Sequence, residues 1–154
     1  MNSELRRKDR GTTKTEAWEL LERGEYGVLS MISSDGVPYG VPLSYCVIDN
    51  SIYFHCAQEG RKLENLAAES RVSFCVVGAT QVLPDKFATN YESVIVSGRA
   101  VEVFEGEKQR GLERLVDKYS APFREAGLAY IASAVRKTRV FRIEIDTITG
   151  KARR

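Results

Sequence analysis

Alternation of apolar and polar residues with a period of two, interrupted by short turns, is the feature that most constrains how this chain can fold. The strand-like segments are residues 26–33, 38–49, 52–57, 71–77, 91–104 and 138–148. The sequences SDG (34–36) and DNS (49–51) are typical of tight turns between antiparallel strands. Because no regular series of strand, helix and strand appears, the pattern favours an antiparallel barrel or sandwich with a few peripheral helices.

Helical spacing is confined to four short segments. The first follows a capping box, in which Thr13 precedes Glu16 by three residues, and Gly24 ends it. The others are residues 61–69, about 106–119 and 122–134. We expect residues 1–12 to form an arm and residues 79–90 a loop, because neither has a clear period. Without a linker, repeat or low-complexity tract, the sequence predicts a single domain that is mainly β with short flanking helices.

Prolines and a glycine within the strand segments predict where the sheet is irregular. Pro38 and Pro42 cannot donate a hydrogen bond to a ladder, so their strand is expected at an edge or a bend. Gly98 lies inside the long segment 91–104 and indicates a bulge or a bend there.

Composition argues against several classes of partner. The chain has 23 Lys and Arg against 21 Asp and Glu, and this net charge of +2 is too small to indicate a nucleic-acid or anionic-membrane partner. Basic clusters at residues 6–10 and 150–154 are more simply explained as solvated termini. No apolar run approaches the ~20 residues that span a bilayer. No hydrophobic segment follows the charged N-terminus, so we expect a cytoplasmic protein.

Cysteine and histidine usage limits the chemistry that the chain can perform. Cys46, Cys56 and Cys75 show no CxxC spacing, and with one histidine a tetrahedral metal site is not expected. A Ser-His-acid or Cys-His-acid centre would need His55, whose neighbour Cys56 points to the opposite face of a strand. Motifs for serine hydrolases, zinc proteases, dinucleotide-binding folds and P-loops are absent. Hydrolase chemistry is therefore disfavoured.

The most informative local feature is the sequence Gly60-Arg61-Lys62 at the start of a predicted helix. Free N–H groups and the dipole make a helix N-terminus partly positive, so two cations there are unfavourable by roughly a few tenths of a kcal/mol or more. A bound anion would reverse that sign and use the N–H groups and both side chains together. The alternative is that both side chains simply extend into solvent. His55 likewise fits either a hydrogen-bonded structural role or a ligand role.

Four stretches of the chain resemble one group of flavoproteins. They are residues 27–45, 52–66, 72–78 and 87–100, and the pattern x-F-H-x-A-x-x-G-x-K within the second is specific. The chain is similar to the nitroimidazole-resistance (Nim) group of the pyridoxamine 5′-phosphate oxidase-like superfamily. The similarity covers nearly the whole chain. It implies a split β-barrel that binds FMN as a homodimer, with two flavins in clefts between the subunits.

The resemblance also implies which residues contact the cofactor. Arg61 and Lys62, after Gly60, would hold the FMN phosphate, and His55 would lie near the flavin. The partner subunit is expected to contribute the 91–94 region. The other residues expected to line the cofactor are Val28, Leu29, Ser30, Pro42, Leu43, Ser44, Tyr45, Cys56 and Ala57, with Tyr91, Ser93 and Val94 from the partner.

Strand alternation gives His55 an expected direction. Ile52, Phe54 and Cys56 form an apolar face that we expect to pack into the core. His55 lies on the opposite face with Tyr53 and is expected to face the cofactor cleft. There it is the candidate catalytic residue, because an imidazole can donate a hydrogen bond or supply a proton.

These implications lead to three hypotheses about function. The first is an FMN-dependent oxidoreductase that reduces nitroaromatic (5-nitroimidazole-like) or similarly electron-poor small molecules. The second is a non-catalytic split-barrel protein that holds a flavin or another flat cofactor such as haem. The third is a structural or partner-binding barrel. Residues 142–154 do not reproduce the arginine-rich closing signature of authentic pyridoxamine phosphate oxidases, so that reaction is not expected.

Overall fold

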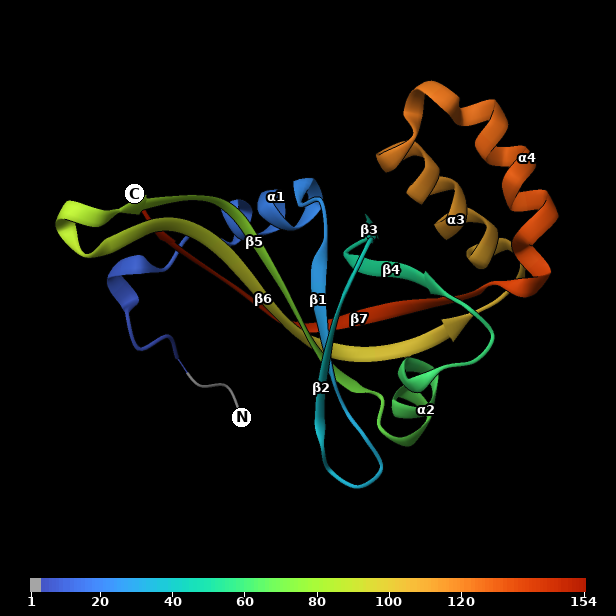
Figure 1. The fold of residues 1–154 in the computed structure, drawn as a ribbon, viewed down its shortest axis with the longest axis horizontal. Coiled ribbons are helices and arrows are strands. Elements are labelled where there is room, and N and C mark those ends of the chain that lie inside the picture. The colour runs from blue at the N-terminus through green and yellow to red at the C-terminus, as the bar shows by residue number, and fades with distance from the viewer. Residues whose placement is uncertain (1–3) are drawn as a thin grey trace.

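The computed structural model describes residues 4–154 and shows there seven antiparallel strands in one sheet, ordered β2-β1-β5-β6-β7-β4-β3 (Figure 1). The strands are β1 Gly27–Ile32, β2 Pro38–Leu43, β3 Cys46–Ile48, β4 Ser51–Cys56, β5 Arg71–Leu83, β6 Ala88–Val103 and β7 Arg139–Arg153. The α-helices are α1 Lys14–Arg23, α2 Arg61–Ala68, α3 Glu105–Tyr119 and α4 Arg124–Ala134. Within the described part of the chain, no helix is both long and apolar enough to cross a membrane.

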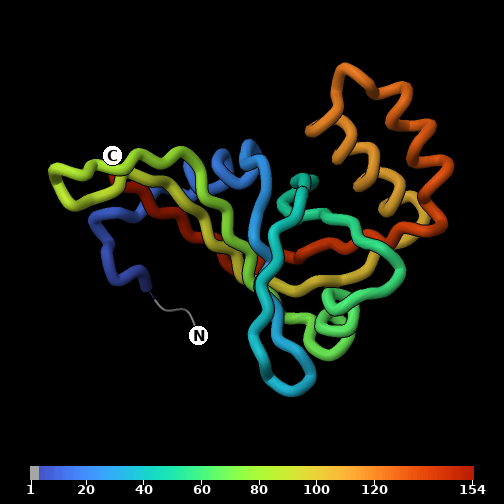
Figure 2. Tube along the Cα trace, in the orientation of Figure 1, coloured from blue at the N-terminus to red at the C-terminus, as the bar shows by residue number. Residues whose placement is uncertain are grey.

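The sheet curls around one apolar core. Leu29 of β1 and Phe54 of β4 belong to the same buried cluster, although three strands separate β1 from β4 in the sheet order. A flat sheet would hold these side chains apart, so the strands close into a barrel (Figure 2). α1 and α2 add Leu21 and Leu66 to the same cluster. The predicted antiparallel barrel is confirmed.

β6 and β7 form the spine of the barrel. β6 pairs with β5 along one edge and with β7 along the other. The register of β6 with β7 shifts between Ser97 and Gly98, where the ladder skips Asp146 of β7. A Cβ atom on Gly98 would lie 2.1 Å from the main-chain oxygen of Glu144, so only glycine fits at this bend. The irregularity predicted at Gly98 is confirmed.

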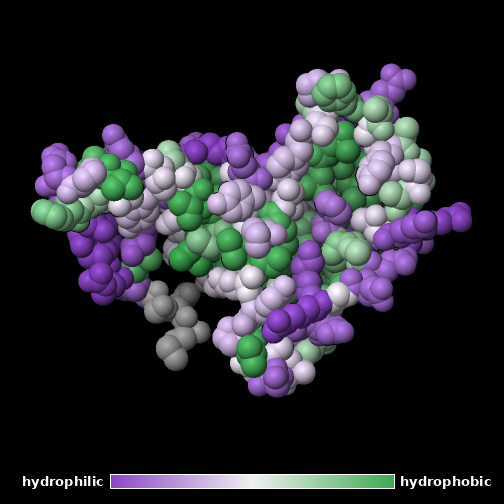
Figure 3. Space-filling view, in the orientation of Figure 1, coloured by the Kyte–Doolittle hydropathy of each residue, from purple (hydrophilic) through white to green (hydrophobic). Residues whose placement is uncertain are grey.

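A second apolar cluster lies under α3 and α4. Tyr53 of β4 and Val140 of β7 turn away from the barrel core and pack against Leu112 and Leu115 of α3 and Ile131 of α4. Figure 1 shows the two helices side by side at one end of the molecule, and Figure 3 shows apolar side chains reaching the surface between them. This end of β4 is therefore covered by helices on the face opposite the barrel core.

Several elements follow the sequence closely. α1 begins at the predicted capping box, in which Thr13 and Glu16 complete both reciprocal hydrogen bonds, and it ends at Gly24. β2 contains both Pro38 and Pro42 and lies at the edge of the sheet, where missing N–H donors are tolerated.

One predicted strand is divided. Residues 38–49 form β2 and β3, which pair with different strands, β1 and β4. Between them Tyr45 turns into the core, where its hydroxyl donates to the main-chain oxygen of Leu21. Its main-chain N–H donates to the Tyr119 hydroxyl at 3.1 Å. These contacts come from α1 and α3, so the local period of the sequence carries no signal of the break.

The prediction of a loop at residues 79–90 is wrong. β5 and β6 continue as a long hairpin through that segment, with Leu83 opposite Ala88 and a turn at Pro84–Lys86 (Figure 1). The side chains of this segment are mostly polar, so the sequence shows no apolar alternation there. Main-chain hydrogen bonds between β5 and β6 nevertheless form the hairpin. β7 also continues past its predicted end to Arg153 because β6 is there to pair with it, so most of the basic tail is strand.

Candidate functional site

Arg61 and Lys62 are the first two residues of α2 and lie against aromatic rings at one end of the barrel. The Cζ atom of Arg61 lies 4.4 Å from the centroid of the Tyr39 ring, and the Nζ atom of Lys62 lies 5.9 Å from that of Phe54. Such cation–π contacts contribute about 0.5–1 kcal/mol at exposed sites. Gly60 precedes the helix at a φ of +142°, and a Cβ atom there would meet no described atom within 4 Å. The space beside the helix start is therefore open.

The start of α2 carries more positive charge and more donors than the described chain compensates. The first N–H groups of a helix have no intrahelical partner, and no side chain of residues 4–154 caps those of α2. In the same range neither Arg61 nor Lys62 forms an ion pair, whereas Arg139 and Arg142 are paired with glutamates. The nearby Asp35 does not pair with Arg61 either. The Ser33 hydroxyl is the main cause of the lowered pKa of the exposed Asp35 carboxyl, and the charge of Arg61 is the smallest cause.

Asn65 adds an unpaired donor on the same side of α2. It follows Lys62 by three residues and Arg61 by four, and residues so spaced are neighbours on a helix surface. Its side chain is only 4% exposed, and its Nδ2 atom has no hydrogen-bond partner among the described residues. A buried donor left unpaired is unfavourable by about 1–3 kcal/mol. A ligand or water that accepts this hydrogen bond would remove the penalty.

His55 lies near the end of β4, beside this helix start. It is exposed and stands opposite Val140 in the ladder with β7. Partial burial of the ring and, second, the nearby Lys62 ammonium lower the pKa of His55 from its usual 6.5. The imidazole is therefore mainly neutral at pH 7, with one nitrogen as donor and the other as acceptor.

The outer face of the barrel carries Val28 and Ser30, two of the residues predicted to line the cofactor. We define this outer face by two rows that cross β1, β5, β6 and β7. One row is Val28, Cys75, Ile95 and Thr149, and the next is Ser30, Ser73, Ser97 and Thr147. Val28 and Ile95 are 36% and 45% exposed, and no helix of the described chain is packed over these rows. The result is an uncovered surface of apolar and small polar side chains.

The structure separates the predicted residues into three groups. His55, Ala57, Gly60, Arg61 and Lys62 gather at the start of α2. Val28, Ser30, Pro42 and Ser44 are exposed on or just after β1 and β2, and Leu43 is half-buried against the core. Tyr91 and Ser93 are half-buried on β6, where Tyr91 lines a pocket of about 360 Å³ with Arg153. In the described range no group of three or more His, Cys, Asp or Glu side chains could hold a metal ion.

Four predicted lining residues turn their side chains away from any surface site. Leu29, Tyr45 and Val94 are fully buried and Cys56 is 8% exposed, because strand alternation or a tertiary contact directs each of them into the barrel. The expectation for these side chains is corrected, since only their main-chain groups remain available to a ligand. Tyr53, on the His55 face, is likewise covered by α3.

Sequence reasoning missed Tyr39 and Asn65. Tyr39 supports the Arg61 guanidinium from β2, and nothing in the local sequence links the two. Asn65 was detectable, because a polar residue four positions after Arg61 falls on the face of α2 that the helix period shares with it.

The family described as pyridoxamine 5′-phosphate oxidase matches residues 13–152, which is nearly the whole chain. Among curated proteins, none matches this sequence.

Solved structures of similar fold include three bacterial proteins. A protein proposed to confer 5-nitroimidazole antibiotic resistance, from Bacteroides thetaiotaomicron, has a TM-score of 0.74 and 21% identity, covering 91% of this chain and 84% of its own. A conserved hypothetical protein of Mycobacterium tuberculosis has a TM-score of 0.82 and 23% identity, covering 97% and 90%. An FAD- and haem-binding protein of Mycobacterium smegmatis has a TM-score of 0.78 and 20% identity, covering 92% and 71%. At these identities the likeness establishes the fold alone.

The surroundings of His55 lead to a prediction that proton NMR can check, because the chain has one histidine. The imidazole signal should titrate below 6.5, and Lys62→Met should raise the pKa of His55 towards that value without restoring it, since burial is the larger cause. The folded state then binds this proton more weakly than the unfolded state, so His55 makes folding less favourable as the pH falls below 6.5. Lys86→Met, on the hairpin turn, is the control. A wild-type midpoint at or above 6.5 would contradict this account.

Proposed function

The chain belongs to the pyridoxamine 5′-phosphate oxidase family, and from this premise we propose that it is a flavin-dependent oxidoreductase that uses FMN. Its proposed substrates are nitroaromatic compounds such as 5-nitroimidazoles, or similarly electron-poor small molecules. The observation that carries the proposal is the uncompensated positive charge at the start of α2. The Bacteroides protein of similar fold, itself connected with 5-nitroimidazole resistance, supports this choice of substrate class.

FMN ends in a phosphate dianion, and the residues at the start of α2 fit such a group. A phosphate accepts hydrogen bonds from a guanidinium, an ammonium and free helix N–H groups, and Arg61, Lys62 and the uncapped helix offer all three. Gly60 leaves the approach open on the side where a Cβ would stand. A dianion at this position would also reverse the unfavourable sign of two cations at a helix N-terminus.

The role of the protein residues follows from this placement. When bound, the flavin would supply the electron transfer, and the protein would bind, orient and tune it. Arg61 and Lys62 would fix the phosphate end of the cofactor. His55, which is mainly neutral at pH 7, can donate a hydrogen bond, and its minor protonated form can release a proton to an acceptor that is being reduced. The stacking of Arg61 on Tyr39 limits the positions that the guanidinium can adopt.

Cofactor binding without turnover is a second candidate function. The Mycobacterium smegmatis protein of similar fold binds FAD and haem. In this chain His55 is the single histidine, the one side-chain type whose ordinary pKa lies close to neutral pH. A site with so few acid–base groups is compatible with a protein that only binds a flat cofactor as well as with one that reduces a substrate.

Oxidation of pyridoxamine phosphate is not the proposed reaction. That substrate also carries a phosphate and would need free basic residues late in the chain. Here Arg139 is bound by Glu102 through two hydrogen bonds of 2.7 and 2.8 Å. Arg142 is shared between Glu107 and Glu144. With these charges neutralised, the first half of β7 offers little to a second phosphate.

A homodimer is part of the proposal. The apolar side chains of Val28 and Ile95 are exposed on the outer face, and no other element of the described chain covers them. Exposed apolar surfaces of this kind often mark protein–protein interfaces. A two-fold pairing through this face is self-complementary. Tyr91 and Ser93 lie on the same strand as Ile95, so the partner's copies would then border the flavin.

The phosphate assignment predicts a selective loss of affinity. Arg61→Ala or Lys62→Ala should weaken FMN binding about tenfold or more, because each charge-assisted hydrogen bond contributes roughly 1.5–3 kcal/mol. Riboflavin, which lacks the phosphate, should bind the wild type weakly and lose little further affinity. Fluorescence titration of both flavins measures this, with Lys86→Ala as the matched control. Unchanged FMN affinity in both variants would refute the assignment.

The oxidoreductase proposal predicts a kinetic effect at His55. His55→Gln should lower the NAD(P)H-dependent reduction of a nitroimidazole by about a hundredfold or more if the residue transfers a proton. FMN occupancy and melting temperature, measured on the same preparation, should remain at the wild-type values. Unchanged turnover at full occupancy would leave His55 as a cofactor-lining residue. A wild type that reduces none of a panel of acceptors would favour the binding function instead.

The dimer proposal predicts that a charge on the outer face separates the subunits. Ile95→Lys should convert a wild-type dimer into a monomer, because a cation cannot be buried unpaired in an apolar interface. Light scattering at micromolar concentration measures the mass. Ala126→Lys, on the exposed side of α4, should leave the dimer intact. A monomeric wild type would overturn both the interface and the shared flavin site.

A further inference from the structure

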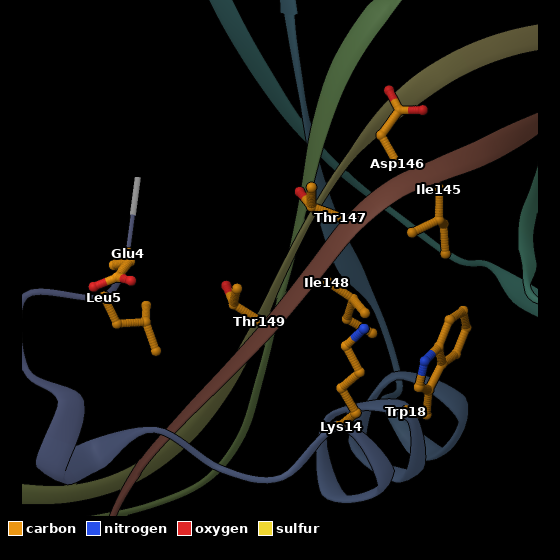
Figure 4. A pocket seen from close by; sticks show the side chains of 9 residues that line it. All are labelled: Glu4, Leu5, Lys14, Trp18, Ile145, Asp146, Thr147, Ile148 and Thr149. Atoms are coloured by element: carbon orange, nitrogen blue, oxygen red, sulfur yellow. The ribbon is translucent and has the colours of Figure 1, made fainter. Parts of the chain in front are cut away.

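A pocket of about 630 Å³ opens between α1, the N-terminal arm and β7 (Figure 4). Its lining comprises Glu4, Leu5, Lys14, Trp18 and residues 145–149. The volume lies in the range of small-molecule sites. None of the residues assigned above to the flavin lines this pocket. Thr147 and Thr149 also belong to the outer face, but Lys14, Trp18, Ile145 and Ile148 lie outside its two rows, so the pocket needs an explanation of its own.

One wall of the pocket is apolar. Trp18, Ile145 and Ile148 are half-buried, packing with one side against the barrel core and leaving the other side to the pocket. Figure 4 shows the Trp18 indole reaching towards Ile145 and the Lys14 side chain reaching towards Ile148. An indole beside two branched aliphatic groups provides the kind of surface on which a planar ring stacks.

A second wall is an unpaired strand edge. The ladder between β7 and β4 ends at Glu144 opposite Ser51, whereas the ladder with β6 continues along the other edge of β7. Between Ile145 and Thr149, the edge of β7 that faces away from β6 has no strand partner in the described chain. Alternate main-chain N–H and C=O groups along such an edge remain available to a ligand.

The charge on the apolar wall is positive. Lys14 forms no ion pair within residues 4–154, whereas Glu4 is paired with Lys8 at 2.5 Å. Figure 4 shows Asp146 projecting to the opposite side of β7 from Lys14 and Trp18. The start of α1 is already capped by the Thr13 side chain, so the free charge is one ammonium rather than a helix N-terminus. One ammonium matches a monoanion better than a phosphate dianion.

We propose that this pocket binds a planar aromatic carboxylate. The ring stacks on Trp18 against Ile145 and Ile148, and the carboxylate lies at the Lys14 ammonium. Polar substituents of the ring bond to the free edge of β7. The site is separate from the start of α2 and goes beyond the proposed redox function, so it does not depend on that function being correct.

The chain has one tryptophan, so the indole N–H signal in a proton–nitrogen NMR spectrum reports on this pocket directly. Nicotinate, benzoate and 4-hydroxybenzoate are titrated into ¹⁵N-labelled protein with excess FMN present, and nicotinamide and benzamide serve as neutral counterparts. We expect saturable shifts of the Trp18 signal with the carboxylates. The amides should bind about fivefold more weakly, as expected for the loss of one exposed charge pair.

Two lysine variants and a competition with FMN test the proposed carboxylate site. Lys14→Met should remove the preference for carboxylate over amide, while Lys86→Met should leave it unchanged. No saturable shift with any carboxylate up to about 10 mM would overturn the proposal, since ligands of this size bind in that range or tighter. Equal affinity for acids and amides would overturn it as well. A second titration without FMN is the competition: carboxylate binding that appears only when FMN is absent would assign the pocket to the flavin and refute a separate site.

Discussion

The pairing of β6 with β7 is the constraint on which the rest of the structure depends. Both strands run the length of the molecule, and every other strand joins the sheet through one of them or through a neighbour. The two strands bend together at Gly98, where the main chain of Glu144 leaves no space for a side chain. This bend, with the extra residue Asp146 opposite, lets a single sheet curl far enough to close on itself.

The same bend divides β7 into two halves with different surroundings. Before it, β7 pairs with β4 and so fixes the register that places His55 opposite Val140. After it, β7 keeps β6 but loses β4, and its free edge faces Trp18 of α1. The proposed cofactor site and the second pocket thus arise on opposite sides of one bulge. A change at Gly98 would disturb both through the backbone of β7, because its ladder partner Ile145 lines the second pocket.

How much could be predicted from the sequence depends on whether a feature is local. The capping box of α1, the edge position of Pro42 and the irregularity at Gly98 each follow from the conformational limits of one or two residues. The break at Tyr45 and the hairpin at 79–90 do not, because contacts from α1 and α3 cause the first and ladder pairing between polar residues the second. The resemblance supplied the barrel and the positions of the expected site. It could not say which side chains strand alternation buries.

Several local costs are compensated within the described residues, but those at the start of α2 are not. Thr13 caps the first helix, and Glu102 and Glu107 neutralise the arginines of β7. In the first two turns of α2, three unfavourable features occur together: an uncapped N-terminus, two unpaired cations and the buried unpaired donor of Asn65. Sequences that specify a fold rarely combine several such conflicts in one place unless something outside the chain relieves them. A single dianion at the helix start would relieve the first two together, which makes the start of α2 a stronger basis for a function than any one of its residues.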